Sequence, residues 1–172
     1  MLDDKGNRNP KDWPKPPQIR GGVPYNPPDS KWIGYGLKVL NQYDNGNNDW
    51  IAMNGNPNEW AVAYHGTSES AVKPICEAGG KFFSNRNEGA ERHLYEDYDN
   101  TNERSQNLYP KCKEGAYASP FLDEANKYYK GAVIMCRVNP NNVRIPQPRI
   151  WITDGTRNDI RPYRILIDLN KN

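Results

Sequence analysis

The sequence has few cysteines and no long apolar run. Its three cysteines, Cys76, Cys112 and Cys136, are widely spaced and form no Cys-x-x-Cys pair. An odd number of distant thiols argues against a disulfide framework and a structural zinc site, so we expect reduced thiols and no bound metal. No segment approaches the roughly 18 consecutive apolar residues that a membrane span needs, and the first residues lack the pattern of a secretory signal. We therefore expect a cytoplasmic or nuclear protein without a membrane partner, although a secreted chain that has lost its signal fits as well.

The sequence also lacks a strong charge of one sign. Its 23 basic and 21 acidic residues give a formal net charge of +2, so nucleic acid is not favoured as an obligatory partner. Apolar residues make up 35% of the chain, and the mean hydropathy is −1.01. The core must be confined to a few short segments, and much of the chain must be loop. The length of 172 residues suits one compact domain, which we expect to be a monomer.

Proline is concentrated near the N-terminus. Residues 1–30 contain seven prolines among charged residues and asparagines. Such a segment offers little apolar surface to offset the entropy of ordering it, so we predict that it is extended or disordered. We place the folded domain at 31–172, opened by an apolar cluster at 33–43. This cluster is too short to distinguish a helix from a strand.

Residues 60–65 alternate large and small side chains, which is typical of a strand. The bulky face should lie in the core. The small face should leave open space into which His65 points at the end of the strand. Thr67 or Ser68 can then cap a helix that runs to about residue 78.

The second half of the chain begins with a long polar stretch at 83–110, which we interpret as a functional loop or lid. Ser119-Pro120 is typical of a helix start, and an apolar stripe continues from it to Tyr129. Three largely apolar segments farther on predict strands, at 132–138, 150–152 and 163–169. This order of elements predicts an α+β domain in which sheets enclose a cleft.

Four short motifs follow one another along the chain. They are Tyr64-His65-Gly66-Thr67, a predicted helix ending in Gly79-Gly80-Lys81, Gly115-Ala116-Tyr117-Ala118-Ser119, and Glu124-Ala125-Asn126-Lys127-Tyr128-Tyr129. In this order they resemble the catalytic domain of the poly-ADP-ribose polymerase superfamily, over roughly residues 60–169. That family has His-Gly-Ser or His-Gly-Thr after a strand, then a Gly-x-Tyr strand, then Ser/Ala-Asn-Tyr on a helix. Here Lys127 intervenes in the last motif, which leaves Tyr129 as a substitute for Tyr128.

The resemblance implies an ADP-ribosyltransferase-like fold with few helices, in which two small packed sheets enclose a cleft for the co-substrate NAD. It also implies that His65 holds the 2′-hydroxyl of a ribose and that Gly66 pairs through its backbone with the nicotinamide amide. Thr67 would lie near the adenine ribose. A glycine suits this position because its backbone can approach a ligand without a Cβ in the way.

The ring-binding part of the site is likewise implied by the resemblance. Tyr117 and Tyr128 would sandwich the nicotinamide, and two aromatic faces suit a flat heteroaromatic ring. Ser119 and Lys81 would complete the cofactor-binding set, although Lys81 fits a surface position equally well.

The family's catalytic glutamate has no counterpart in this sequence. When residues 159–163 are aligned with the family's last strand, its position falls near Ile150 or Trp151, and neither has a carboxyl group. The implied catalytic set is therefore His65, Tyr117 and Ile150. Asp154 could swing in, but it lies beyond the predicted strand.

These residues predict an NAD-dependent enzyme that transfers single ADP-ribose units and releases nicotinamide. A protein is the favoured acceptor, ahead of a nucleic-acid end or a small molecule. One alternative is a degenerate module that binds NAD, ADP-ribose or a partner without transfer. Another is a purely structural interaction domain with no pocket.

Overall fold

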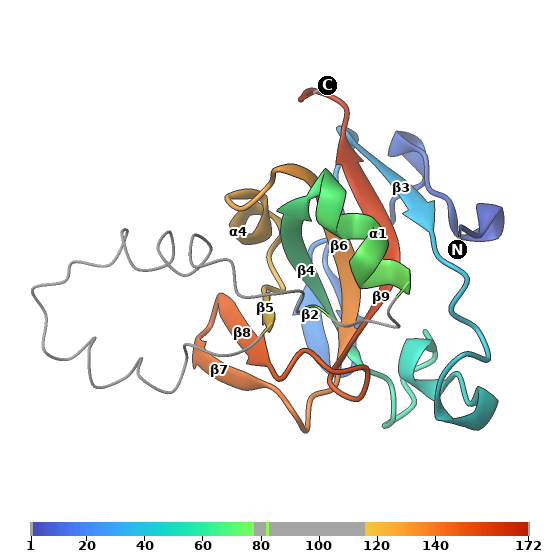
Figure 1. Cartoon of the computed structure of the whole chain (residues 1–172). Coiled ribbons are helices and arrows are strands. Elements are labelled where there is room, and N and C mark those ends of the chain that lie inside the picture. The colour runs from blue at the N-terminus through green and yellow to red at the C-terminus, as the bar shows by residue number, and fades with distance from the viewer. Residues whose placement is uncertain (1, 78–81, 83–115, 172) are drawn as a thin grey trace, which may run out of the picture.

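The structure, a computed structural model, describes residues 2–77, Phe82 and residues 116–171 (Figure 1). This part of the chain is a mixed α+β fold with few helices and antiparallel sheets of four, three and two strands, which confirms the predicted class. Its strands are β1 (Gln18–Arg20), β2 (Val23–Tyr25), β3 (Trp32–Gly36), β4 (Ala61–Ser68), β5 (Ala116–Ala118), β6 (Gly131–Val138), β7 (Arg144–Gln147), β8 (Ile150–Thr153) and β9 (Ile160–Asp168). Its α-helices are α1 (Glu69–Glu77) and α4 (Leu122–Asn126), and short 3₁₀ helices lie at Asp4–Gly6, Pro10–Asp12, Asp44–Gly46 and Asp49–Ile51. None of the described helices is long and apolar enough to cross a membrane.

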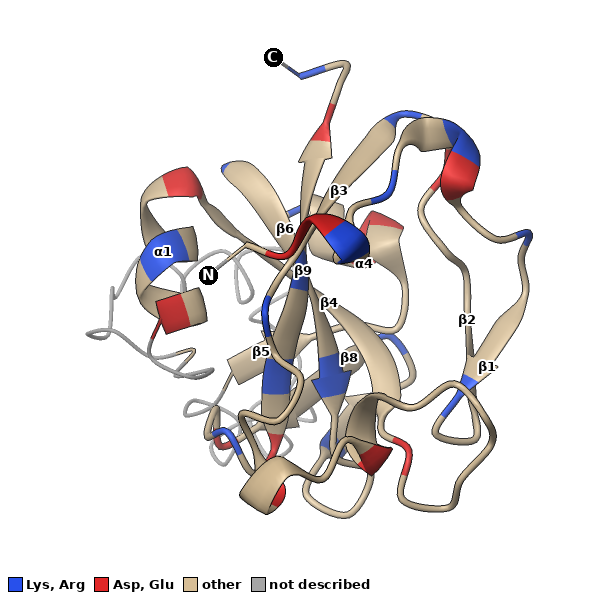
Figure 2. Ribbon diagram, turned by 90° about the vertical axis from the view of Figure 1, so that its right-hand side faces the viewer, with Lys and Arg blue, Asp and Glu red and all other residues tan. Residues whose placement is uncertain are grey.

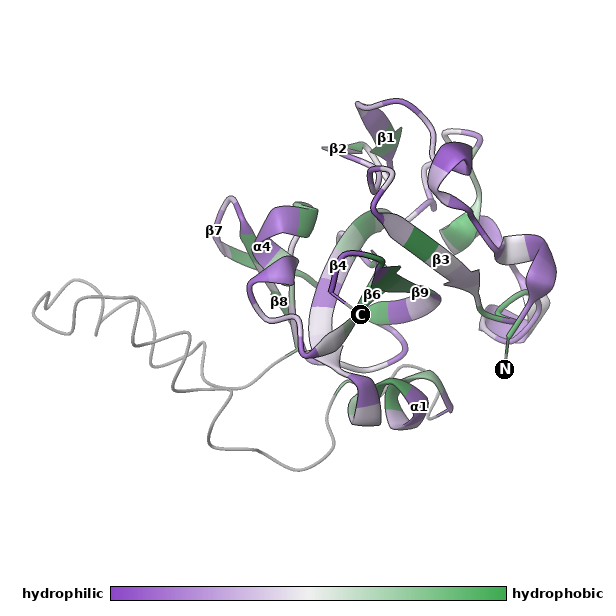
Figure 3. Ribbon diagram, turned by 90° about the horizontal axis from the view of Figure 1, so that it is seen from above, coloured by the Kyte–Doolittle hydropathy of each residue, from purple (hydrophilic) through white to green (hydrophobic). Residues whose placement is uncertain are grey.

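Strands β6 and β9 form the interior of the four-stranded sheet, whose order is β3-β9-β6-β4. Residues 132–138 of β6 are all buried, as the apolar run in the sequence predicts. Both faces of β6 are covered, since Ile134 and Met135 belong to different core clusters. Figure 3 shows hydrophobic residues along β3, β6 and β9 and hydrophilic residues on much of the N-terminal segment and α4.

Strand β4 is longer than predicted, and its small face is not open. It pairs with β6 as far as Ser68, so His65 lies within the strand and not at its end. Ala61 and Ala63 are at most 1% exposed and pack in one cluster with Trp151 of β8. The alternation of large and small residues thus identified the strand, but the space beside the alanines is filled by side chains from the small sheet.

The three-stranded sheet has the order β5-β8-β7, and its strand β5 lies beside β4 of the larger sheet. Tyr64 of β4 and Ser119, just after β5, form an isolated antiparallel bridge. They exchange both backbone hydrogen bonds, at 2.7 and 2.9 Å. The two sheets therefore meet along β4 and β5, which carry two of the four sequence motifs.

Helix α1 begins where the sequence predicts, and helix α4 is shorter than predicted. Helix α1 begins at Glu69, directly after β4, contains Pro74 and lies across the front of the large sheet in Figure 1. Helix α4 ends at Asn126, because the Lys127 N–H is shared between the carbonyls of Glu124 and Ala125 and tightens the last turn. The aromatic residues 128–129 consequently lie in the turn after α4 and not on it.

The N-terminal segment is part of the fold. Strands β1 and β2 form a hairpin, and Tyr25 is buried in a core cluster with Trp32 and Tyr64. The Trp13 indole Nε1–H donates to the backbone carbonyl of Trp32 at 2.9 Å. Residues 1–30 thus pack on the sheets through a few aromatic side chains, which supply apolar surface that the average composition of the segment conceals.

Two buried arginines fasten the irregular segment between β3 and β4. Arg137 of β6 donates to the Glu59 carboxylate at 3.2 Å and to three backbone carbonyls of residues 51–60. Arg161 of β9 forms two hydrogen bonds to Asp44, at 2.7 and 2.8 Å. Its guanidinium also lies over three aromatic rings, those of Tyr43, Trp50 and Trp60. The apolar cluster predicted at 33–43 is a strand as far as Gly36 and then joins this irregular segment.

Candidate functional site

His65 and Tyr117, two of the implied site residues, are in direct contact across β4 and β5. The Nδ1 atom of His65 lies 2.7 Å from the backbone oxygen of Tyr117. A carbonyl oxygen can only accept a hydrogen bond, so Nδ1 carries the proton and donates. In the neutral imidazole this leaves Nε2 without a proton and able to accept a hydrogen bond from a hydroxyl.

This contact also interrupts the pairing of β4 with β5. Alternate residues of a strand direct their backbone groups to the same edge, so Gly66 presents its N–H and C=O toward β5 as Tyr64 does. Tyr64 uses these groups in the bridge to Ser119. The next pair would join Gly66 to Tyr117, yet the Tyr117 carbonyl accepts from the His65 imidazole instead. Within the described part of the chain, no hydrogen bond joins Gly66 to β5.

The His65 imidazole is neutral at pH 7. Burial lowers its pKa below the ordinary value of histidine, and the hydrogen bond to the Tyr117 carbonyl opposes this effect without overcoming it. The ring of Phe82 stands edge-on to the imidazole, with the ring centroids 5.0 Å apart. His65 thus combines an apolar setting with one hydrogen bond that selects its tautomer.

Gly66 is needed for packing. An added Cβ would lie 2.1 Å from the backbone oxygen of Ala125 and 3.0 Å from the Cβ of Tyr128. The end of α4 therefore occupies the room that a side chain at Gly66 would need. Ligand approach is the reason expected from the sequence for this glycine, and packing on the α4 side of β4 is a second reason.

Tyr117 and Ile150 share one face of the small sheet. Ala116 and Ala118 are buried in a core cluster, so the side chain of Tyr117 between them lies on the opposite face of β5 and is half-buried. Tyr117 pairs with Ile152 of β8, and Ile150 lies two residues away on that face of β8. The structure thus brings the implied Ile150 position to the same side of the sheet as Tyr117.

Tyr128, and not Tyr129, lies beside the β4 motif. Its backbone and Cβ contact Gly66, and its side chain is half-buried. Tyr129 packs instead against the Trp32 ring, with centroids 6.0 Å apart, and the Lys171 ammonium lies 4.5 Å from its ring centre. The substitution of Tyr129 for Tyr128 that the inserted lysine suggested therefore has no support in the packing.

The remaining implied residues have local structural roles or lie outside the described residues. Thr67 is 9% exposed and pairs with Ala132 of β6. Ser119 is buried, and its hydroxyl accepts a hydrogen bond from the Phe121 N–H at 3.1 Å. Lys81, Gly115 and the predicted loop at 83–110 lie outside the described residues.

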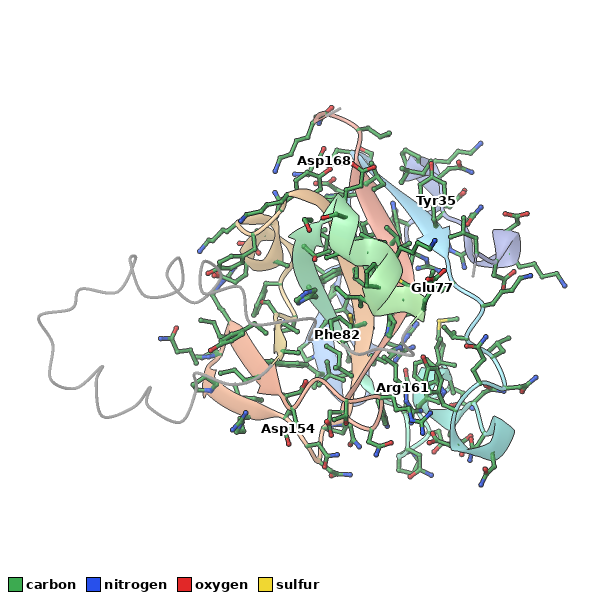
Figure 4. The ribbon with its side chains drawn as sticks, viewed as in Figure 1. Tyr35, Glu77, Phe82, Asp154, Arg161 and Asp168 are labelled. Atoms are coloured by element: carbon green, nitrogen blue, oxygen red, sulfur yellow. The ribbon has the colours of Figure 1, made fainter. Side chains whose placement is uncertain are left out.

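Asp154, the carboxylate nearest to Ile150 in sequence, is engaged elsewhere. Asp154 is 79% exposed in its side chain and pairs with Arg144 at 3.5 Å, and Figure 4 shows it at the rim of the molecule. Arg149, directly before Ile150, donates to Glu124 of α4 at 3.1 Å and pairs with Asp123. These pairs raise the pKa of Arg149.

The link between Arg149 and α4 was missed at the level of sequence. The helix dipole already accounted for two acidic residues in a first turn, and nothing in the spacing marks Arg149 as their partner. Figure 2 shows acidic residues on α4, with a basic residue directly after the helix. The ion pairs tie the first turn of α4 to the start of β8.

The described residues provide no metal site. They contain no group of three or more histidine, cysteine, aspartate or glutamate side chains placed to hold an ion. A hollow of about 280 Å³ lies elsewhere, between the segment at 37–43, the end of α1 and Pro162. None of the implied site residues lines it.

Comparison of the chain with family models, with curated proteins and with solved structures finds no match. The case for a function therefore rests on the geometry around β4 and β5.

Proposed function

We propose that this chain binds NAD where β4 and β5 separate and transfers single ADP-ribose units from it to a protein, releasing nicotinamide. One observation carries the proposal. The His65 imidazole donates through Nδ1 to the Tyr117 carbonyl at 2.7 Å. The imidazole Nε2 and the backbone groups of Gly66 are therefore available at the edge of β4 that faces β5. A strand edge that ends in this way offers a donor and two acceptors to a ligand.

These groups suit the nicotinamide end of NAD. A carboxamide has one acceptor and one donor side, which match the N–H and C=O of Gly66. The bare Nε2 of His65 can accept a hydrogen bond from a ribose hydroxyl. Tyr117 and Tyr128 are both half-buried, and rings in such positions can stack on a flat heteroaromatic group.

The reaction breaks the bond between C1 of the ribose and the nicotinamide nitrogen. Nicotinamide leaves with the bonding electron pair, and an acceptor nucleophile forms a new bond to C1 and loses its proton. The oxocarbenium-like transition state resembles that of glycoside hydrolysis. Because Ile150 offers no carboxylate to activate a hydroxyl, we expect single transfers without chain growth; loss of one general base commonly costs about 100- to 10,000-fold.

The test uses the full chain, isotopically labelled NAD and a cell lysate. We expect labelled protein, free nicotinamide and, by intact-mass spectrometry, adducts of one ADP-ribose unit. The matched control is His65→Gln, which keeps a polar side chain but cannot supply the same acceptor geometry. A ladder of repeated ADP-ribose units contradicts single transfer, and absence of NAD binding contradicts the whole proposal.

A second candidate is a module that binds NAD or ADP-ribose without transfer. It is favoured by Ile150 at the position of the family's glutamate and by the exposure of Asp154, which pairs with Arg144. This candidate predicts measurable NAD affinity with neither adducts nor free nicotinamide. The same labelled incubation distinguishes it from the enzyme.

A further inference from the structure

The ring of Phe82 packs beside the His65 imidazole, with the ring centroids 5.0 Å apart. The two ring planes meet at 85°, so that one ring presents its edge to the other. Phe82 is 8% exposed and packs in the same cluster as Ala63 and Ile134. Its backbone N–H donates to the Gly155 carbonyl at 3.4 Å, and Figure 4 shows it in the middle of the molecule. The imidazole is therefore held by the Tyr117 carbonyl at Nδ1 and by an edge-to-face contact with the Phe82 ring.

We infer that Phe82 is a positioning residue for His65: it fixes the imidazole in the orientation that donates to Tyr117 and keeps water away from it, so that Nε2 remains the acceptor. A solvated imidazole exchanges between two tautomers and two protonation states. Confinement by Phe82 and the Tyr117 carbonyl leaves one tautomer and one protonation state. The use of Nε2 for a ribose hydroxyl rests on the proposed function, whereas the confinement itself does not.

The pKa of His65 is lowered by the exclusion of water and not by a neighbouring charge. Two thiols pack in the cluster that contains Phe82, those of Cys136 on β6 and Cys76 at the end of α1. Burial raises the pKa of both, that of Cys76 to about 11, so both are neutral. From β5 the contact is the Tyr117 backbone carbonyl. Burial and the Tyr117 carbonyl are the two causes of the shift in the His65 pKa, and no charged side chain of the described residues contributes to it.

The test is the titration of His65 by ¹⁵N NMR of its imidazole. The chain has two histidines, so a His93→Gln background leaves one signal set to follow. We expect Phe82→Ala to raise the His65 pKa toward the ordinary value of about 6.5 and to convert one tautomer into a mixture. The matched control is Ile75→Ala, which removes a buried side chain from the same cluster but has no ring contact with His65. This control should leave the pKa and the tautomer of His65 as in the parent.

A second variant keeps the inference testable if Phe82→Ala does not fold. Phe82→Leu retains apolar volume without an aromatic edge, and we expect it to lose the single tautomer. Unchanged tautomer and pKa in Phe82→Ala, or an unchanged tautomer in Phe82→Leu, overturn the inference.

Calorimetry with NAD separates this outcome from the fate of the proposed function. If the parent binds no NAD but the Phe82 variants show the NMR changes, the proposed function alone is contradicted. If the parent binds NAD but the Phe82 variants do not show the NMR changes, the role of Phe82 alone is contradicted.

Discussion

Two regions of the molecule use polar groups in opposite ways. Around Arg137 and Arg161, charged side chains are buried and engage carboxylates and backbone carbonyls inside the protein. Where β4 and β5 separate, His65 satisfies one ring nitrogen internally and leaves the other available, and Gly66 has backbone groups without a partner on β5. The first arrangement is explained by folding alone. The second leaves binding capacity that folding does not use, and for this reason we place the site there.

The largest expected effect concerns the folding region. Arg137→Ala should lower the free energy of unfolding by about 3–5 kcal/mol, because it leaves the Glu59 carboxylate and several carbonyls buried without their donor. Urea denaturation measures this. The control Arg20→Ala removes a more exposed partner of Glu59, at 3.6 Å, and should cost much less. Equal losses in the two variants would contradict the distinction between buried and exposed partners.

Gly66→Ala tests whether the site region also has a folding constraint. The added Cβ would meet the Ala125 carbonyl, so α4 must move, and we expect a loss of about 3 kcal/mol, at the upper end for overpacking. Thermal or urea unfolding gives the value, with Ser68→Ala at the half-buried end of β4 as the control. A Gly66→Ala variant as stable as the parent would show that α4 can shift at little cost. Ligand approach would then be the better reason for this glycine.

His65→Ala sharpens the comparison from the binding side. NAD affinity should fall by about 1–3 kcal/mol, the cost of leaving a ligand hydroxyl without its acceptor. Isothermal calorimetry measures the change, and His93→Gln serves as the control for loss of a histidine. If the folded His65→Ala variant binds NAD as tightly as the parent, His65 belongs with the structural groups.

The smallest effect is a dependence of stability on pH. Burial lowers the pKa of His65, so between the folded value and about 6.5 the unfolded chain binds a proton that the folded chain does not. The contribution of His65 to the free energy of unfolding is full above about pH 6.5 and declines as the pH falls toward the folded pKa. Unfolding measured from pH 7.5 to pH 5 should show a smaller decline for His65→Gln than for the parent. Parallel curves would indicate that His65 titrates normally.

The sequence by itself determined the class of the fold and the principal strands. Long apolar or alternating runs report their own conformation, because burial of one or both faces sets the period of side chains along a strand. This is why 132–138 and the strand that includes His65 could be predicted. The order of motifs also singled out His65 and Tyr117 before any contact between them was known.

Only the tertiary structure decided which faces are open and which groups are already used. The alanines of β4 are covered by Trp151 from a distant strand, and Gly66 is pressed against α4. Arg149 engages α4 through pairs that no spacing signals. The hydrogen bond from His65 to Tyr117 joins residues 52 positions apart. Such facts depend on how separate segments pack, and packing is set by the shapes and polar groups of all the neighbours together and not by the pattern along any one segment.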